Sequence, residues 1–136
     1  MPRNFQHGFS FQRLSIYVPL ILLLFTGCQQ RNDVIAGVEI PIPKNMTKNT
    51  DKPIATVPGF EAGQVSYEGK VTPAEIFTFY QEVMAAKGWQ PTARFADQKD
   101  QIAYTKENRL VLIRSNQVPG GTTILTVLVR TEEPTK

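Results

Sequence analysis

The segment from Thr72 to Gly88 carries the clearest secondary-structure signal in the chain. The hydroxyl of Thr72 can accept a hydrogen bond from the backbone of Glu75, while the Glu75 carboxylate can reach back to the backbone N–H of Thr72. Pro73 suits the first position of a helix, and Lys87 followed by Gly88 is typical of a helix end. The sequence therefore predicts one amphipathic helix, whose apolar side comprises Ile76, Phe77, Phe79, Tyr80, Val83 and Met84.

Several short runs around this helix have the alternation and the turn signals of β-strands. Because the connections between these runs are short, neighbouring strands are expected to pair antiparallel. The predicted fold class is α+β, with an antiparallel sheet of about four to six strands and one helix packed on one face as a two-layer sandwich. The predicted strands are 64–70, 89–95, 101–105, 109–115 and 122–130, with a short edge strand at 54–57 and extended chain at 38–43.

The last two predicted strands are apolar on both faces over part of their length, at Leu110–Ile113 and Ile124–Val129. One helix can cover only one face of a sheet, so the second face needs another cover. Two covers remain open, namely the chain's own segment Val38–Met46 and a partner or a second copy of the chain. We treat the following residues as the candidate interaction surface: Leu110, Leu112, Leu125 and Val127.

Residues 1–27 have the layout of a secretory signal peptide. Arg3 and Arg13 form a basic start without acidic residues, and the apolar run Leu14–Phe25 follows. This run is shorter than the roughly 20 apolar residues that a membrane-spanning helix needs. We therefore expect the segment to be cleaved and exclude it from the fold.

The only cysteine of the chain, Cys28, follows this apolar run directly. Phe25, Thr26, Gly27 and Cys28 resemble the lipobox of bacterial lipoproteins, although Phe25 stands where leucine is usual. The resemblance implies that signal peptidase recognises Phe25, Thr26 and Gly27, and that a diacylglyceryl group is attached to the Cys28 thiol. The alternative is an ordinary core cysteine. Gln29 replaces the aspartate that often retains such proteins in the inner membrane, which favours the outer membrane, facing the periplasm, in a Gram-negative host.

Cleavage of 27 residues from the 136-residue chain leaves 109, enough for one small domain. We expect a lipidated cysteine and a flexible tether over residues 28–37, because QQRNDVIAG is mostly polar. A single α+β domain is expected over 38–131, followed by a C-terminal tail at 132–136.

The mature chain has a narrow chemical inventory. Loss of Arg3 and Arg13 lowers the formal net charge from +3 to +1, which argues against nucleic acid as a partner. His7, the only histidine, leaves with the signal peptide, so imidazole-dependent triads and the usual zinc and copper sites are not expected. We expect no metal and no cofactor, and we expect that the protein is not an enzyme.

Carboxylates, aromatic rings and basic side chains each offer a candidate site, and each also has a structural explanation. Glu61, Glu68 and Glu75 could include an acid/base pair, although Glu75 caps the helix. The aromatic residues could bind a glycan or a lipid, or could fill the layer between helix and sheet. The basic residues could bind lipid head groups or an anionic polymer, or could protect exposed strands from aggregation. The aromatic residues are Tyr67, Tyr80, Trp89, Phe95 and Tyr104, and the basic residues are Lys106, Arg109, Arg114 and Arg130.

IPIPKNM at 40–46 and VSYEGKVTPAEIFTFYQEVMAAKGWQ at 65–90, with Gly88-Trp89 at the helix end, resemble small bacterial lipoproteins of unknown function. The resemblance implies a strand–helix–meander domain and brings no activity with it. We therefore expect a membrane-anchored, non-enzymatic interaction or accessory module of the bacterial envelope, with an envelope protein as partner or self-association. The alternatives are a lipid- or glycan-binding lipoprotein and a carboxylate-dependent hydrolase.

Overall fold

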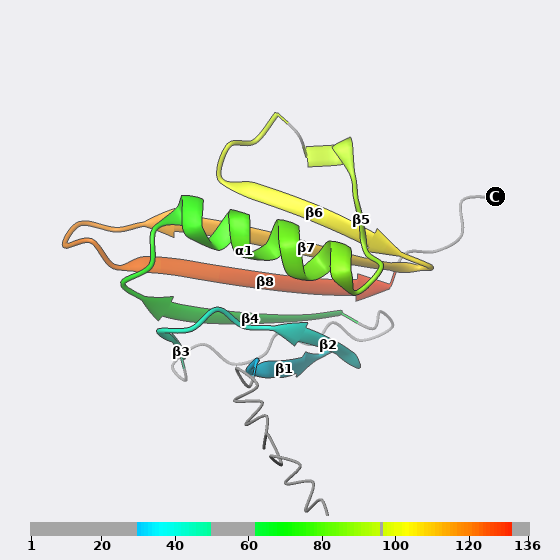
Figure 1. Cartoon of the computed structure of the whole chain (residues 1–136), viewed down its shortest axis with the longest axis horizontal. Helices are drawn as coiled ribbons and strands as arrows, with labels where there is room; N and C mark the ends of the chain where they lie inside the picture. The colour runs from blue at the N-terminus through cyan, green and yellow to red at the C-terminus, as the bar shows by residue number, and fades with distance from the viewer. Residues whose placement is uncertain (1–29, 50–61, 96, 132–136) are drawn as a thin grey trace, which may run out of the picture.

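The computed structural model describes residues 30–49, 62–95 and 97–131. One helix packs on a six-stranded antiparallel sheet with the order β3-β4-β8-β7-β6-β5, and a two-stranded hairpin packs beside the helix (Figure 1). The α+β fold class is thus confirmed. The elements are β1 (Asn32–Ile35), β2 (Val38–Pro41), β3 (Met46–Lys48), β4 (Ala62–Gly69), α1 (Pro73–Ala86), β5 (Gln90–Pro91), the 3₁₀ turn η1 (Ala93–Phe95), β6 (Gln101–Lys106), β7 (Arg109–Gln117) and β8 (Thr123–Thr131).

Helix α1 begins and ends where its signals predict. The Thr72 hydroxyl accepts a hydrogen bond from the Glu75 backbone at 3.3 Å, and the Thr72 backbone N–H donates to the Glu75 carboxylate at 2.8 Å. Lys87 is the C-cap, and Gly88 adopts a φ of +79°, which glycine tolerates better than other residues. The predicted capping box is therefore confirmed.

The strands that follow the helix are confirmed except for the first. Only Gln90 and Pro91 of the predicted strand 89–95 pair with β6, and the chain then enters η1. Proline cannot donate to a ladder, and the next backbone N–H, that of Thr92, donates to Ala103 at 3.0 Å as the chain leaves the sheet. The predicted edge strand at 54–57 lies outside the described residues.

The flexible tether predicted for residues 28–37 is wrong from Gln30 onward, because Gln30 and Arg31 already make hydrogen bonds to Ile42. Residues 32–35 form β1, which pairs with β2 through a turn at Ala36 and Gly37, both with positive φ. Ile35 is 1% exposed and belongs to the core. Only this one side chain of β1 is fully buried, so the segment shows too little apolar alternation to be recognised as a strand.

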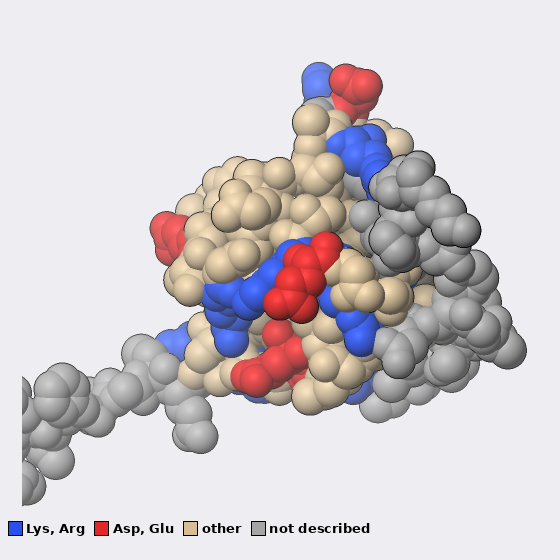
Figure 2. Space-filling model, turned by 90° about the vertical axis from the view of Figure 1, so that its right-hand side faces the viewer, with Lys and Arg blue, Asp and Glu red and all other residues tan. Residues whose placement is uncertain are grey.

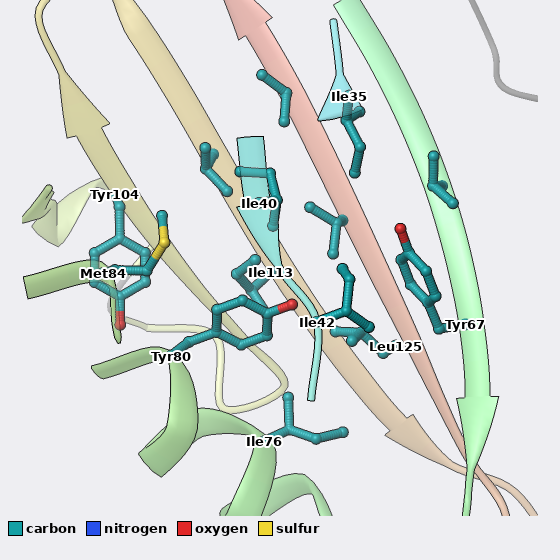
Figure 3. Close-up of a cluster of buried hydrophobic side chains, with 14 of the residues drawn as sticks. Ile35, Ile40, Ile42, Tyr67, Ile76, Tyr80, Met84, Tyr104, Ile113 and Leu125 are labelled. Carbon is teal, nitrogen blue, oxygen red and sulfur yellow. The ribbon is translucent and has the colours of Figure 1, made fainter. Parts of the chain in front are cut away.

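The hairpin and the helix cover the same face of the sheet. Ile40 and Ile42 from the hairpin segment join Tyr80 of α1 and Leu125 of β8 in one buried cluster (Figure 3). The prediction that Val38–Met46 could cover the second face is therefore wrong. The helix occupies too little of the first face to close it alone, and the hairpin completes the cover.

A buried tyrosine fastens the hairpin to the sheet. Tyr67 of β4 donates its hydroxyl to the carboxylate of Asp33 at 2.7 Å, and the ammonium of Lys48 donates to the same oxygen at 2.9 Å. Partial burial of Asp33 acts to raise its pKa, but the bonds from Tyr67 and Lys48 and the charge of Lys48 outweigh that effect, and the pKa is lowered. Burial, followed by the bond to Asp33, raises the pKa of Tyr67.

Replacing Asp33 tests this fastening through its pH dependence. Asp33→Asn should lower the free energy of unfolding near pH 7 by about 1–2 kcal/mol, because a charge-assisted hydrogen bond is lost. The folded-state pKa of Asp33 is depressed, so its contribution is present above the unfolded pKa and is lost as pH falls through the folded pKa. Chemical denaturation of both proteins from pH 7 to pH 2 should show the difference closing in acid. The control Glu82→Gln, on an exposed site of α1, should stay near wild type, and a gap that does not vary with pH would contradict the account.

Candidate functional site

A groove of about 510 Å³ opens between α1, β6 and the segment that joins β5 to β6. This volume lies within the range typical of small-molecule and peptide sites. Phe77, Trp89, Ile102 and Tyr104 supply the larger apolar side chains of its wall. The groove is the strongest candidate site among the described residues.

The helix contributes one row of side chains to the groove. Phe77, Gln81 and Ala85 are spaced four residues apart, which places them one above another along α1. Phe77 packs at the margin of the core, whereas Gln81 and Ala85 are exposed. The row therefore forms one wall that changes from apolar to polar toward solvent.

The chain after the helix contributes the opposite side. The backbone N–H of Trp89 donates to Met84 at 3.0 Å, which turns the chain back toward the sheet. Because β5 ends at Pro91, the following residues leave β6 and loop outward before Gln101. The early end of β5 thus leaves open space beside Ile102 and Ala103, and that space is the groove.

The groove suits an uncharged ligand. Trp89 and Tyr104 are 6% and 3% exposed and form its floor, and burial raises the pKa of the Tyr104 phenol. Gln81 and Gln98 are exposed at its sides, and each amide can both donate and accept hydrogen bonds. Among its described lining residues Lys99 is the single charged side chain, and none is a carboxylate.

The aromatic residues that the sequence grouped together, apart from Phe95, all belong to the buried core. Trp89 and Tyr104 also line the groove, whereas Tyr67 and Tyr80 are not among its lining residues (Figure 3). The Tyr80 hydroxyl is buried without a hydrogen-bond partner among the described residues, and burial raises its pKa. The side chain of Phe95 is outside the described part of the structure.

The predicted interaction surface combines residues from both faces of the sheet and is wrong in part. Leu125 and Val127 lie on the helix face and are fully buried in the core. Leu110 and Leu112 point to the other face, where Leu110 is also buried, at 1% exposure. Register decides the matter, because Val127 lies opposite Ile113 and cannot share a face with Leu112.

The second face is only lightly hollowed. Leu112 and Leu128 are half-buried there beside a depression of about 90 Å³. In the part of the chain that the structure describes, the large hydrophobic side chains that are exposed are Val34 on β1 and Val118 just after β7. The described residues therefore form no broad exposed apolar patch on this face.

The basic residues after the helix hold elements together. Lys106 donates to the backbone oxygen of Lys87 at 2.7 Å, Arg109 donates to Ala36 at 3.0 Å, and Arg114 donates to the Gln101 side chain at 2.9 Å. Figure 2 shows basic and acidic side chains interspersed on one side of the molecule. The predicted basic stripe is thus divided among separate structural contacts.

The two predicted carboxylates that the structure describes, Glu68 and Glu75, have separate surroundings. Glu75 caps α1, Glu68 is exposed on β4, and Glu61 lies outside the described residues. Among residues 30–49, 62–95 and 97–131, no three His, Cys, Asp or Glu side chains gather to hold a metal ion. No helix of these same residues is long and apolar enough to cross a bilayer. Cys28 and the residues of the lipobox are also outside the described part.

Sequence reasoning missed the polar side of the groove. Gln81, Gln98 and Lys99 looked like ordinary surface residues, and only the loop after β5 brings Gln98 near the helix. The row of Phe77, Gln81 and Ala85 was the one available signal. Family models, curated proteins and solved structures were compared with the chain, and none of them matches it.

Proposed function

We propose that this chain is an envelope lipoprotein, anchored through a diacylglyceryl group on Cys28, whose domain is a non-enzymatic interaction module. The observation that carries the proposal is the groove, with an aromatic floor, amide-bearing sides and no lining carboxylate among the described residues. Such a lining favours binding over acid–base chemistry. The lipobox resemblance at residues 25–28 supports the anchor and, with Gln29, an outer-membrane location facing the periplasm in a Gram-negative host.

The occupant that fits best is an uncharged, mostly apolar segment of a partner protein in the envelope. Phe77 and Ile102 offer contacts for apolar side chains, and the Gln81 and Gln98 amides can pair with the backbone groups of a bound segment. Lys99 disfavours a basic segment. A charged ligand would find little to compensate its desolvation in this groove.

A glycan is the second candidate, supported by the same aromatic floor. Trp89 and Tyr104 provide apolar ring surface, and two neighbouring amides could bind sugar hydroxyls. Both rings are nearly buried, however, which leaves less ring face for stacking than an open aromatic platform offers. The partner segment is therefore preferred.

The anchor is tested by replacing the cysteine. Cys28→Ser should abolish incorporation of labelled acyl chains into the chain in growing cells, because serine supplies no thiol to alkylate. The control Gln29→Ala should keep incorporation. Mass spectrometry of the purified proteins reads the result, and an acylated Cys28→Ser chain would contradict the proposal.

The groove is tested by photo-cross-linking in cells from two adjacent helix positions. A cross-linking residue in place of Gln81 faces the groove, whereas one in place of Glu82 lies on a different side of α1 and serves as the matched control. We expect position 81 alone to capture one recurrent protein through a mostly apolar segment. Adding Ala85→Trp, which fills the groove from an exposed site, should abolish that capture while circular dichroism stays unchanged.

The remaining outcomes of this experiment decide against the proposal. Equal capture from positions 81 and 82, or capture that survives Ala85→Trp, would mean that the groove is not the binding site. A saccharide mass on the cross-linked peptide would replace the partner protein with a glycan.

A further inference from the structure

The proposed anchor and the first fixed residues of the domain are nearly adjacent in the sequence. Only Gln29 separates Cys28 from Gln30, whose side-chain amide donates to the backbone of Ile42 at 3.1 Å. The backbone oxygen of Arg31 accepts from Ile42 at 2.8 Å, and its guanidinium donates to the backbone of Met46 at 3.0 Å. The folded domain thus begins two residues after the cysteine, at Gln30.

Such a short connection limits how far the domain can stand from a bilayer. Two residues of fully extended chain span about 7 Å. If Cys28 carries acyl chains buried in the bilayer, Gln30 must lie at the level of the lipid headgroups. We propose that the end of the domain around Gln30 rests on the headgroup phosphates of the membrane that holds the anchor. The inference rests on the proposed lipidation of Cys28.

The chemistry of this end suits anionic phosphates. Arg31, Lys44 and Lys70 are exposed. Met46 of β3 pairs with Gly69 of β4. Lys44 and Lys70 therefore lie just past the same end of the β3–β4 ladder, on two neighbouring segments. A Cβ on Gly69 would stand 2.1 Å from the Asn45 backbone oxygen, which shows how closely the two segments approach there. We call Arg31, Lys44 and Lys70 the basic end.

Several carboxylates of the described residues lie near the basic end. Asp33 is paired with Lys48 at 2.9 Å, and the Glu75 carboxylate accepts hydrogen bonds from Thr72 in the helix cap. Glu68, exposed on β4, and Glu39, whose carboxylate accepts a hydrogen bond from the side chain of Asn32, are the other described carboxylates near this end. Arg31 and Lys70 place positive charge at this end, which an anionic bilayer surface attracts.

This placement sets the orientation of the groove. The basic end lies beside β3, at one edge of the sheet, and the groove lies beside β6, four strand positions away in the order β3-β4-β8-β7-β6. Strands lie about 4.8 Å apart, so roughly 19 Å separates the two sites across the sheet. β3 and β6 lie on opposite sides of the sheet (Figure 1), so with β3 toward the bilayer the groove beside β6 lies on the side away from it and is accessible to a soluble or neighbouring partner.

Fluorescence quenching by lipid headgroups tests this orientation. Cys28 is the only native cysteine, and the lipid occupies its thiol, so one introduced cysteine can be labelled alone. Thr47→Cys on β3 and Asp97→Cys in the loop before β6 are both exposed sites. The lipidated chains are placed in vesicles of phosphatidylglycerol and phosphatidylethanolamine that contain a headgroup-labelled quencher. Quenching at position 47 should exceed that at position 97 several-fold.

Two further variants make the result specific. A glycine–serine linker of about 20 residues inserted before Gln30 should reduce quenching at position 47 to the level at position 97, because the short connection is removed. The pair Lys44→Gln and Lys70→Gln, made without the linker, should weaken quenching at position 47 in part. Both variants leave Cys28 and the core side chains unchanged.

Mass spectrometry of the same samples distinguishes failure of the proposed lipidation from failure of the proposed orientation. An unacylated Cys28 would overturn the proposed lipoprotein and the orientation with it. An acylated Cys28 with equal quenching at positions 47 and 97, unaffected by the linker, would overturn the orientation alone.

Discussion

The shared burial of a hairpin and a helix on one face of the sheet is the constraint on which the rest of the structure depends. Ile40 and Ile42 meet Ile76 and Tyr80 over the sheet, and all four side chains are fully buried. Burial of each such side chain contributes roughly 1.5–3 kcal/mol. Since β1 lies against β4 and α1 against β7, removal of the hairpin would expose the part of the face that α1 does not reach. The N-terminal segment is therefore a structural part of the domain.

The position of this segment links the two functional proposals. Its first hydrogen bonds are made by Gln30 and Arg31, so the fold leaves almost no free chain after Cys28. The groove lies at the opposite edge of the same rigid sheet. A lipoprotein built in this way would hold its binding site at a fixed distance from the bilayer and in a fixed orientation. A long tether would instead let the domain search the space around its anchor.

The parts of the structure that could be predicted from the sequence depend on local signals. The capping box joins Thr72 and Glu75, three residues apart, and it was read correctly. Strand β1 could not be predicted, because Ile35 is its only deeply buried side chain and the segment has no clear apolar alternation. The assignment of Leu125 to a sheet face depends on its register with Ser115, which no local pattern reveals. The groove depends on the path of the chain after Pro91, so Gln98 could not be placed beside the helix in advance.

Amide hydrogen exchange at Ile42 tests most directly whether the fold begins at the anchor. The Ile42 N–H donates to the Arg31 backbone oxygen at 2.8 Å, and the Ile42 side chain is fully buried. Measured in the mature chain, this amide should be protected to a degree similar to that of Val127 in the centre of the sheet, because both open only with the core. Exchange at the rate of an unstructured peptide, with Val127 still protected, would show that residues 30–42 are a loose tether and would contradict the account.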